Sequence, residues 1–106
     1  MAENKSHIFS EDRQQIAVYC DAMSHPARAA ILELLAENGR LSCSELTGLL
    51  PLAQPTVSQH LGKLRKAGMV RFEKEGLSSL YEINPKVTDE MRRLFYELIN
   101  KVSNPL

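Results

Sequence analysis

The side chains with the widest reactive chemistry in this sequence are two cysteines and three histidines: Cys20, Cys43, His7, His25 and His60. A thiol can ligate a soft metal or be oxidised, and an imidazole can ligate a metal or exchange a proton near neutral pH. None of them form a pair with metal-ligand spacing, and no glycine-rich phosphate loop or G-x-S-x-G motif is present. An enzyme is therefore the least favoured class of protein.

Positive charge is concentrated in one segment of a chain that is neutral overall. The sequence has 13 basic and 13 acidic residues. Between Gln54 and Lys74, five basic residues stand against one acidic residue, a net charge of +4 that leaves −4 for the remainder. A single lysine is usually just a solvated charge on the protein surface, but this cluster of basic residues indicates a surface that binds a polyanion.

Length and composition set the class of molecule. A chain of 106 residues, 43% of them hydrophobic, fits a single domain spanning residues 1–106. No apolar run approaches the ~20 residues of a membrane span, and the first residues lack the apolar stretch of a secretory signal. We therefore expect a cytoplasmic protein with free thiols and no membrane partner.

Capping residues, chain breakers and apolar periodicity predict five helices. The residues that mark the starts and ends of these helices are, in chain order, Ser10, Pro26, Asn38-Gly39, the capping box Ser42-Cys43-Ser44-Glu45, Pro51, Pro55, Ala67-Gly68 and Asn84-Pro85. The apolar faces expected from helical spacing are Ile16, Tyr19, Cys20 and Met23; Ala27, Ala30, Ile31, Leu34 and Leu35; Leu46, Leu49 and Leu50; Val57, Leu61 and Leu64; and Val87, Met91, Leu94, Phe95, Leu98, Ile99 and Val102.

The third and fourth helices, joined by a turn of roughly three to four residues, have the spacing of a helix-turn-helix. Two short strands follow, Met69 to Glu75 and Leu80 to Ile83, around the polar connection Gly76-Leu77-Ser78-Ser79. A β-hairpin directly after a helix-turn-helix makes a winged helix. The expected fold is therefore mainly α with a small β-hairpin: a winged helix-turn-helix of five helices plus a two-stranded wing.

The fourth helix has a polar face opposite its core stripe, at about 100° per residue. That face carries Pro55, Gln59, Gly62, Lys63 and Lys66, with Thr56, Ser58 and His60 on its flanks. Lysines suit DNA phosphates, glutamine suits a base edge and hydroxyls suit either. Gly62 costs a helix roughly 1 kcal/mol relative to alanine unless close backbone approach offsets that cost.

In these features the chain resembles the ArsR/SmtB family of winged-helix repressors over nearly its whole length. The strings that carry the resemblance are Gln54-Pro55-Thr56-Val57-Ser58-Gln59-His60-Leu61, His25-Pro26-Ala27-Arg28 with Ile31-Leu32, Ser44-Glu45-Leu46, Leu64, Lys66-Ala67-Gly68-Met69-Val70, Gly76 and Tyr81. The resemblance implies a homodimer that binds double-stranded operator DNA and releases it when it meets its signal.

The resemblance also implies two sets of site residues. Recognition-helix contacts would come from Gln54, Thr56, Ser58, Gln59 and His60, and wing contacts from Lys74, Ser78 and Tyr81. The charge distribution adds Lys63 and Lys66 to the DNA surface. The dimer would be built from the first and last helices, through Ile16, Tyr19, Met91, Leu94, Phe95, Leu98 and Val102. The last helix is also more apolar than a winged-helix core alone requires.

The sequence departs from the family's metal sensors at both familiar metal sites. Ser42 and Ser44 stand where those sensors carry two cysteines, and Cys43 falls about 100° around the helix from each. Serine hydroxyls cannot replace thiolates for a soft or borderline metal. The last helix, where other members use Asp, His and Glu, has no histidine. We therefore expect no bound metal ion and no cofactor, and the sequence does not identify the inducer.

The reactive side chains then have plainer interpretations. Cys20 is expected to pack as a small hydrophobic residue and Cys43 to be an ordinary surface residue, with redox sensing through the two thiols as the alternative. His25 is expected to be structural at a helix N-cap. His60 is expected to contact DNA or to pack, with a proton switch as the alternative.

We therefore predict a dimeric, sequence-specific transcriptional regulator of the ArsR type, a repressor by resemblance and not an enzyme. The alternatives are a thiol-based redox regulator and a winged-helix module that binds another protein, which would have an apolar or acidic wing face. An enzyme using Cys43 would need a base beside the thiol, and no sequence feature supplies one.

Overall fold

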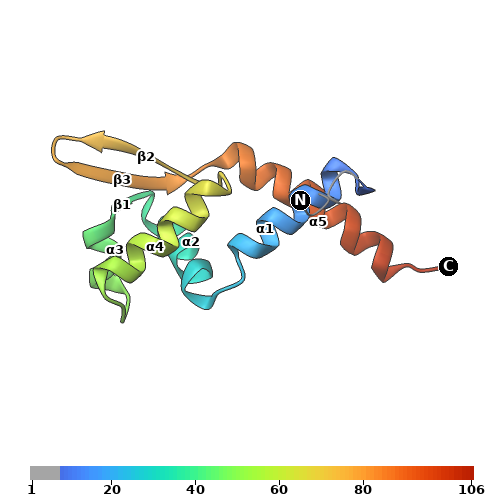
Figure 1. The fold of residues 1–106 in the computed structure, drawn as a ribbon, viewed down its shortest axis with the longest axis horizontal. Helices are drawn as coiled ribbons and strands as arrows, with labels where there is room; N and C mark the ends of the chain where they lie inside the picture. Colours follow the sequence, from blue (N-terminus) through green and yellow to red (C-terminus); the bar gives the residue numbers. More distant parts are fainter. Residues whose placement is uncertain (1–7) are drawn as a thin grey trace, which may run out of the picture.

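The computed structural model describes residues 8–106, which form five helices and three strands (Figure 1). In chain order these are α1 (Glu11–Ala22), α2 (Pro26–Asn38), β1 (Arg40–Ser42), α3 (Cys43–Leu49), α4 (Gln54–Lys66), β2 (Val70–Glu75), β3 (Ser78–Ile83) and α5 (Pro85–Ser103). The predicted winged helix-turn-helix with five helices is confirmed. No helix in the described residues is both long and apolar enough to cross a membrane.

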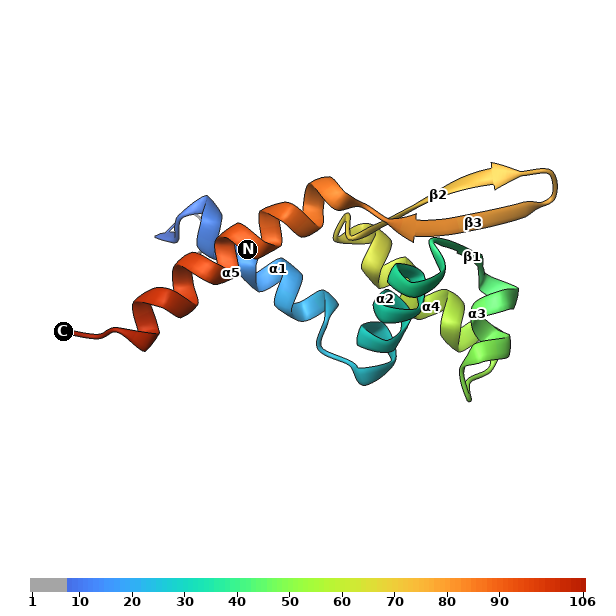
Figure 2. The same cartoon turned by 180° about the vertical axis from the view of Figure 1, so that it is seen from behind.

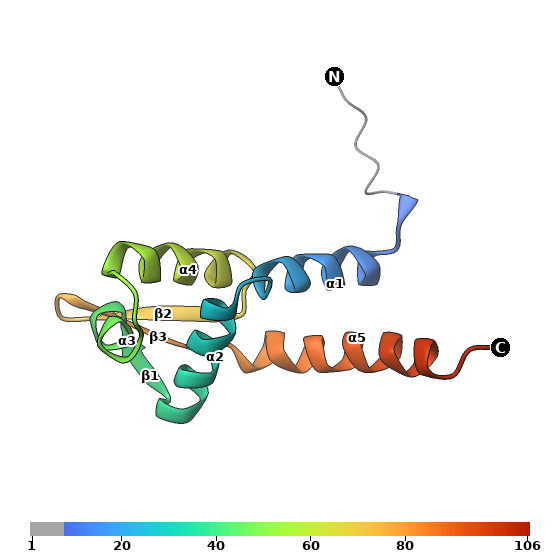
Figure 3. The same cartoon turned by 90° about the horizontal axis from the view of Figure 1, so that it is seen from below.

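The molecule has two parts. Helices α2, α3 and α4 pack with the sheet to form the winged helix-turn-helix (Figures 1 and 2). Helices α1 and α5 lie side by side beyond it and form an arm, which is clearest when the molecule is seen from below in Figure 3. The wing and the far end of this arm therefore point in opposite directions.

The sheet has one more strand than the sequence predicts. Its order is β1-β3-β2, with both pairs antiparallel. Strand β1 is only three residues long, too short for an alternating pattern, and it pairs with β3, which is distant in sequence. The hairpin turn is also tighter than expected, because Glu75 pairs with Ser78 and only Gly76 and Leu77 are left to connect the strands. Gly76, with φ 64°, supplies the positive φ that such a two-residue turn needs at its first position.

Side-chain hydrogen bonds confirm the predicted starts of α1 and α3. The Ser10 hydroxyl accepts from the Arg13 amide at the start of α1. Before α3, the Ser42 hydroxyl accepts from the Glu45 amide at 3.0 Å, and the Glu45 carboxylate accepts from the Ser42 amide at 2.9 Å. These reciprocal bonds satisfy amides that a helix start leaves without partners.

One continuous core joins the helices to the sheet. Its buried members are Tyr19, Ala22, Ile31, Leu35, Leu41, Leu46, Val57, Leu61, Leu64, Met69, Val70, Met91 and Leu94.

Three expected core positions are wrong. Cys20 and Met23 are exposed, because α1 buries the side that carries Tyr19 and Ala22 and no other element covers the adjacent one. Leu49 is 54% exposed, since the short α3 buries Leu46 and presents its last turn to solvent.

A partly buried hydrogen bond connects the two helices of the arm. The Tyr19 hydroxyl on α1 donates to the Glu90 carboxylate on α5 at 2.9 Å. Burial raises the pKa of Tyr19 above its ordinary value, and the hydrogen bond and the negative charge of Glu90 raise it further. The folded protein therefore stabilises the neutral phenol.

We expect Tyr19→Phe to lower the free energy of unfolding by about 1 kcal/mol at pH 7, because the hydrogen bond to Glu90 is lost. The contribution is complete below the ordinary tyrosine pKa and disappears as the pH rises through the raised pKa of the folded state. Urea unfolding followed by circular dichroism at pH 7 and above pH ~10 measures both effects. Tyr96→Phe, at an exposed position of α5, is the control. A Tyr19→Phe difference that grows at alkaline pH would contradict this assignment.

Candidate nucleic-acid interface

Helix α4 lies at the edge of the winged helix (Figure 3), and its polar residues Gln59, Lys63 and Lys66 are exposed. Val57, Leu61 and Leu64 are buried against the core, as the sequence predicts. On the opposite side, a shallow depression of about 380 Å³ is lined by Gln59, Gly62, Lys63 and Lys66. The structure therefore brings together the base-reading and phosphate-binding candidates of α4. Gln54 and Ser58 are also exposed, whereas Thr56 and His60 are half-buried.

The wing has two different faces, which its strand register defines. Phe72 pairs with Tyr81 and Lys74 pairs with Ser79, so these four side chains share the face that also carries Val70 and Ile83. The other face, which we call the outer wing face, carries Arg40, Arg71, Glu73, Glu75 and Glu82.

Ion pairs neutralise the guanidinium groups of the outer wing face. Arg40 lies 2.9 Å from Glu73, 3.8 Å from Glu75 and 3.7 Å from Glu82. Arg71 lies 3.0 Å from Glu82. Three carboxylates against two guanidiniums leave this face with a net charge of −1. That charge repels DNA, and the wing candidates Lys74 and Tyr81 lie on the opposite face. The third wing candidate, Ser78, pairs with Glu75 at the hairpin turn, so the register places it on the outer wing face.

The basic segment is therefore less available than its sequence suggests. Arg71 is paired, and the guanidinium of Arg65 stacks on the Phe72 ring, with its central carbon 3.9 Å from the ring centroid. Within residues 8–106, Lys63, Lys66 and Lys74 have no carboxylate within 4.0 Å. These three lysines are the cations free to meet phosphates.

A polar groove joins the wing to the start of α4. It has a volume of about 290 Å³ and is lined by Ser42, Cys43, Ser44, Gln54, Ser78, Ser79 and Tyr81. The structure thus brings Gln54 together with Ser78 and Tyr81, as the resemblance implies. Sequence reasoning missed Ser42, Ser44 and Ser79 as groove residues. Ser79 could have been found from the hairpin register, because it pairs directly with Lys74.

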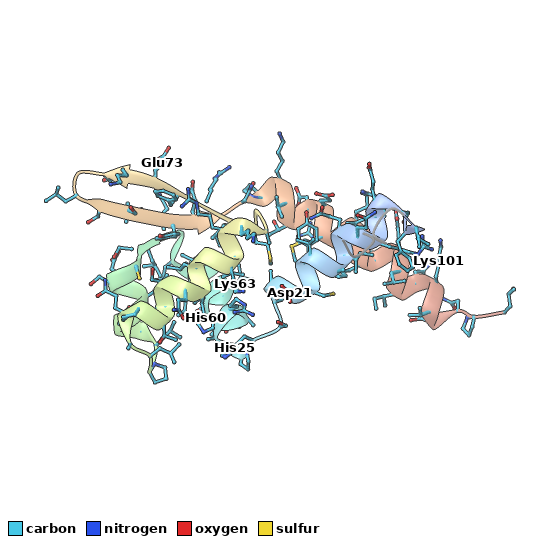
Figure 4. The ribbon with its side chains drawn as sticks, in the orientation of Figure 1. Asp21, His25, His60, Lys63, Glu73 and Lys101 are labelled. Carbon is cyan, nitrogen blue, oxygen red and sulfur yellow. The ribbon has the colours of Figure 1, made fainter. Side chains whose placement is uncertain are left out.

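His60 faces α2 and contacts Arg28 there. Its Nδ1 lies 3.0 Å from Nη1 of Arg28, and its ring centroid lies 4.5 Å from that of His25 (Figure 4). Burial lowers the pKa of His60, and the positive charges of His25 and Arg28 lower it further. His60 is therefore neutral at pH 7 and packs between helices. His25 caps α2 through Nδ1, which accepts from the Ala27 amide at 3.0 Å.

The two cysteines occupy different parts of the fold. Cys20 is exposed on α1, contrary to the packing role expected of it. Cys43, at the start of α3, is half-buried and lines the polar groove at the surface. Helices α1 and α3 stand apart in all three ribbon views (Figures 1, 2 and 3). No group of three or more His, Cys, Asp or Glu residues in the described part of the chain could hold a metal ion. His7 lies outside the residues that the structure describes.

The residues expected at a dimer interface divide into three groups by exposure. Tyr19, Met91 and Leu94 are buried within the single chain, so they cannot form much of a surface between chains. Ile16 and Phe95 are half-buried. Leu98 and Val102 are exposed on α5, 39% and 61% respectively, and Ile99 beside them is 57% exposed.

A helix-turn-helix, a wing and an exposed lysine-bearing helix define a DNA-binding winged-helix protein, and the comparisons with known proteins agree. Residues 23–71 match the family model of a helix-turn-helix domain. The chain is 39% identical to an HTH-type transcriptional regulator of Methanocaldococcus jannaschii, over 83% of this chain and 99% of that protein. It is 38% identical to a biofilm growth-associated repressor of Agrobacterium fabrum, over 65% of this chain but only 58% of that protein.

Solved structures agree with these relatives. The transcriptional activator HlyU of Vibrio cholerae is 36% identical over 76% of this chain and 74% of its own length. The structure of HlyU matches with a TM-score of 0.69 at 31% identity, covering 88% of this chain and 100% of that chain. An ArsR-like regulator from Rhodococcus shares the fold, with a TM-score of 0.76 at 24% identity over 84% of this chain and 83% of that chain. The chain belongs to the ArsR family of helix-turn-helix transcriptional regulators.

The depression on α4 yields a prediction for Gly62. An added Cβ at Gly62 meets nothing within 4 Å, so the fold itself does not require glycine there. We expect Gly62→Ala to stabilise the protein by about 1 kcal/mol and to weaken DNA binding, because the methyl group stands where DNA approaches the helix. Thermal unfolding and fluorescence anisotropy with labelled DNA measure the two effects.

Gly48 on α3 provides the matched control, since a Cβ there also meets nothing within 4 Å. Gly48→Ala should stabilise the protein and leave DNA affinity unchanged. If Gly62→Ala binds DNA as tightly as the wild type, the backbone of α4 does not approach DNA at this point.

Proposed function

We propose that this protein is a homodimeric, sequence-specific repressor that binds operator DNA through α4 and the lysine-bearing face of the wing, and that it is not an enzyme. The observation that carries the proposal is the exposed face of α4, where Gln59 lies beside two lysines without carboxylate partners. Gln59 contacts a base edge, and Lys63, Lys66 and Lys74 contact phosphates. Repression needs nothing more than occupancy of the operator.

The polar groove extends this surface toward the wing. Gln54, Ser78 and Tyr81 line it from α4 and β3, and hydroxyl and amide groups are suitable donors to phosphate oxygens. Thr56 and Ser58 on α4 complete the proposed contact set. His60 contributes through its packing against α2, since its ring meets Arg28 and His25 there.

We expect the affinity for DNA to fall steeply with salt. If each subunit of a dimer neutralises three phosphates, log K should fall with log[salt] at a slope of about −5. Lys74→Ala should reduce this slope by about 2, because each dimer loses two phosphate contacts. Lys63→Ala should weaken all sequences about equally, whereas Gln59→Ala should weaken the cognate site preferentially. Anisotropy titrations across a salt series provide the slopes.

Arg71→Ala is the matched control for this series. Its charge is already paired with Glu82, so the slope should stay nearly constant. If the wild-type protein binds no DNA at low salt, including DNA enriched from a random pool, the proposed function is overturned.

The arm supports the dimeric part of the proposal. The apolar stripe of α5 continues past the part that packs against α1, which leaves Leu98, Ile99 and Val102 exposed. Leu98 also lines a groove of about 260 Å³ between α1 and α5, together with Ile16 and Leu94 and with polar residues that include Asp12 and Glu97. Burying such side chains contributes ~1.5–3 kcal/mol each, enough for a few from each subunit to offset much of the association cost.

We expect Leu98→Glu to produce a monomer that stays helical and loses high-affinity DNA binding. A carboxylate in an apolar interface is costly to bury, and a monomer holds only one half-site, whereas a dimer spans two half-sites about 34 Å apart. Sedimentation, circular dichroism and a gel-shift titration decide the outcome. Asn100→Glu, on the polar side of α5, is the control and should remain dimeric. A wild type that is monomeric at tens of micromolar would contradict the prediction.

The absence of the family's usual metal ligands is also part of the proposal. Ser42 and Ser44 occupy the positions of the sensor thiolates, and the Ser42 hydroxyl is already used to accept from the Glu45 amide. Cys43 has its thiol near the backbone carbonyl of Gln54, 3.9 Å away, rather than near a second thiol. These contacts favour a signal other than a thiolate-bound metal.

A further inference from the structure

The guanidinium group of Arg28 connects three separate parts of the fold. Its Nε donates to the Ala22 carbonyl at 2.6 Å, at the end of α1. Its Nη2 donates to the Ser24 hydroxyl at 3.3 Å, in the connection between α1 and α2. Its Nη1 lies 3.0 Å from Nδ1 of His60, on α4. One side chain of α2 thus holds the arm and the helix that carries the DNA-contact candidates.

The contact with His60 requires a particular protonation state. Arginine has only donors, so Nδ1 of His60 accepts and its proton is on Nε2. Protonation at Nδ1 would replace an acceptor by a second donor and place two positive charges together. The hydrogen bond between α2 and α4 therefore exists only while His60 is neutral.

We propose that Arg28 is a positioning residue for DNA recognition, which sets the orientation of α4 relative to the arm through neutral His60. The proposal rests on the DNA-binding function proposed above. Base contacts depend on the angle and depth of a recognition helix, whereas phosphate attraction depends much less on them. Loss of the Arg28 contact should therefore reduce discrimination between cognate and unrelated DNA more than it reduces overall attraction.

Lysine cannot perform this role. The three acceptors of Arg28 are reached by three different nitrogens of a planar group, and the single ammonium of lysine cannot reach them together. Arg28→Lys keeps the positive charge and removes the geometry, so it separates positioning from electrostatics.

The surroundings of His60 favour loss of the contact in acid. Burial and the positive charges of His25 and Arg28 keep the pKa of His60 below its ordinary value, so the neutral form dominates at pH 7 and is lost as the pH falls through the lowered value. Asp21 of α1 and Lys63 and Lys66 of α4 are further charged groups, and they line one cleft between these two helices. In Figure 4 the labelled side chains of Asp21, His25, His60 and Lys63 gather around the junction of α1, α2 and α4.

The first test compares Arg28→Lys with the wild type on a DNA site that the wild type selects from a random pool. We expect cognate affinity to fall by about tenfold, the size of one mismatched base-pair contact, with little change in affinity for unrelated DNA. The helical signal and the dimer should be unchanged. Arg92→Lys, at an exposed arginine of α5, is the control and should bind both DNAs like the wild type.

The second test replaces His60. The amide oxygen of His60→Asn can accept from Arg28 in place of Nδ1 and does not titrate, whereas His60→Leu cannot accept. We expect the wild type to lose cognate preference as the pH falls below 6.5 and through the lowered pKa of His60, His60→Asn to keep its preference over the same range, and His60→Leu to lack it throughout.

The outcomes separate this inference from the proposed function. A wild type without cognate preference overturns both. A wild type with cognate preference that Arg28→Lys shares fully overturns the inference alone. The inference is also overturned if His60→Asn loses its preference in acid as the wild type does, because the remaining histidines then account for the pH dependence.

Discussion

Burial of one side of α4 determines which side chains of this helix are available to meet DNA. Val57, Leu61 and Leu64 are at most 1% exposed, so the helix cannot rotate without exposing a large apolar area. Helical geometry then forces Gln59 and Lys63 toward solvent on the opposite side. Their presentation therefore requires no special contact of their own. The contact between His60, on the flank of α4, and Arg28 of α2 is different, because it depends on the protonation state of His60.

The arm follows from the same principle applied to a longer helix. Helix α5 has 19 residues, and α1 has only 12 to cover it. Tyr19 meets Glu90 in the first half of α5, and Asp12 approaches Arg93 at 4.0 Å near its middle. Beyond this point the stripe continues as Leu98 and Val102, which are 39% and 61% exposed. A second copy of the arm is a surface of matching size and polarity.

Much of the fold could be predicted from the sequence because its signals are local. The helix starts at Ser10, His25 and Ser42 are hydrogen-bonded to amides two or three residues away, so residue identity alone reports them. Strand β1 could not be predicted in this way. Its only partner is β3, and three residues carry no periodicity of their own. The prediction that Cys20 is buried was wrong for a related reason, because helical spacing does not show which neighbouring elements cover a face of the helix.

The candidate site shows the same division between local and distant information. A count of charges in sequence gives +4 for the segment from Gln54 to Lys74, but it cannot show that Glu82 pairs with Arg71 or that Arg65 stacks on Phe72. Angular position around α4 likewise places His60 on the flank of the polar face, and only the packed structure shows its partner on α2. Contacts between residues distant in sequence therefore decide which side chains of a correctly predicted motif are free to meet DNA.

The small number of available cations makes geometry more important than net charge in this protein. The chain is neutral overall, so long-range attraction to DNA is weak, and the outer wing face carries a net charge of −1. Three lysines in one chain neutralise too few phosphates for tight binding at physiological salt. In the dimer proposed above, affinity comes from joining two such surfaces at a fixed separation, and specificity comes from holding each α4 at a fixed angle. Both the separation of the two surfaces and the angle of each α4 depend on the junction of α1, α2 and α4, where the arm meets the helix proposed to face DNA.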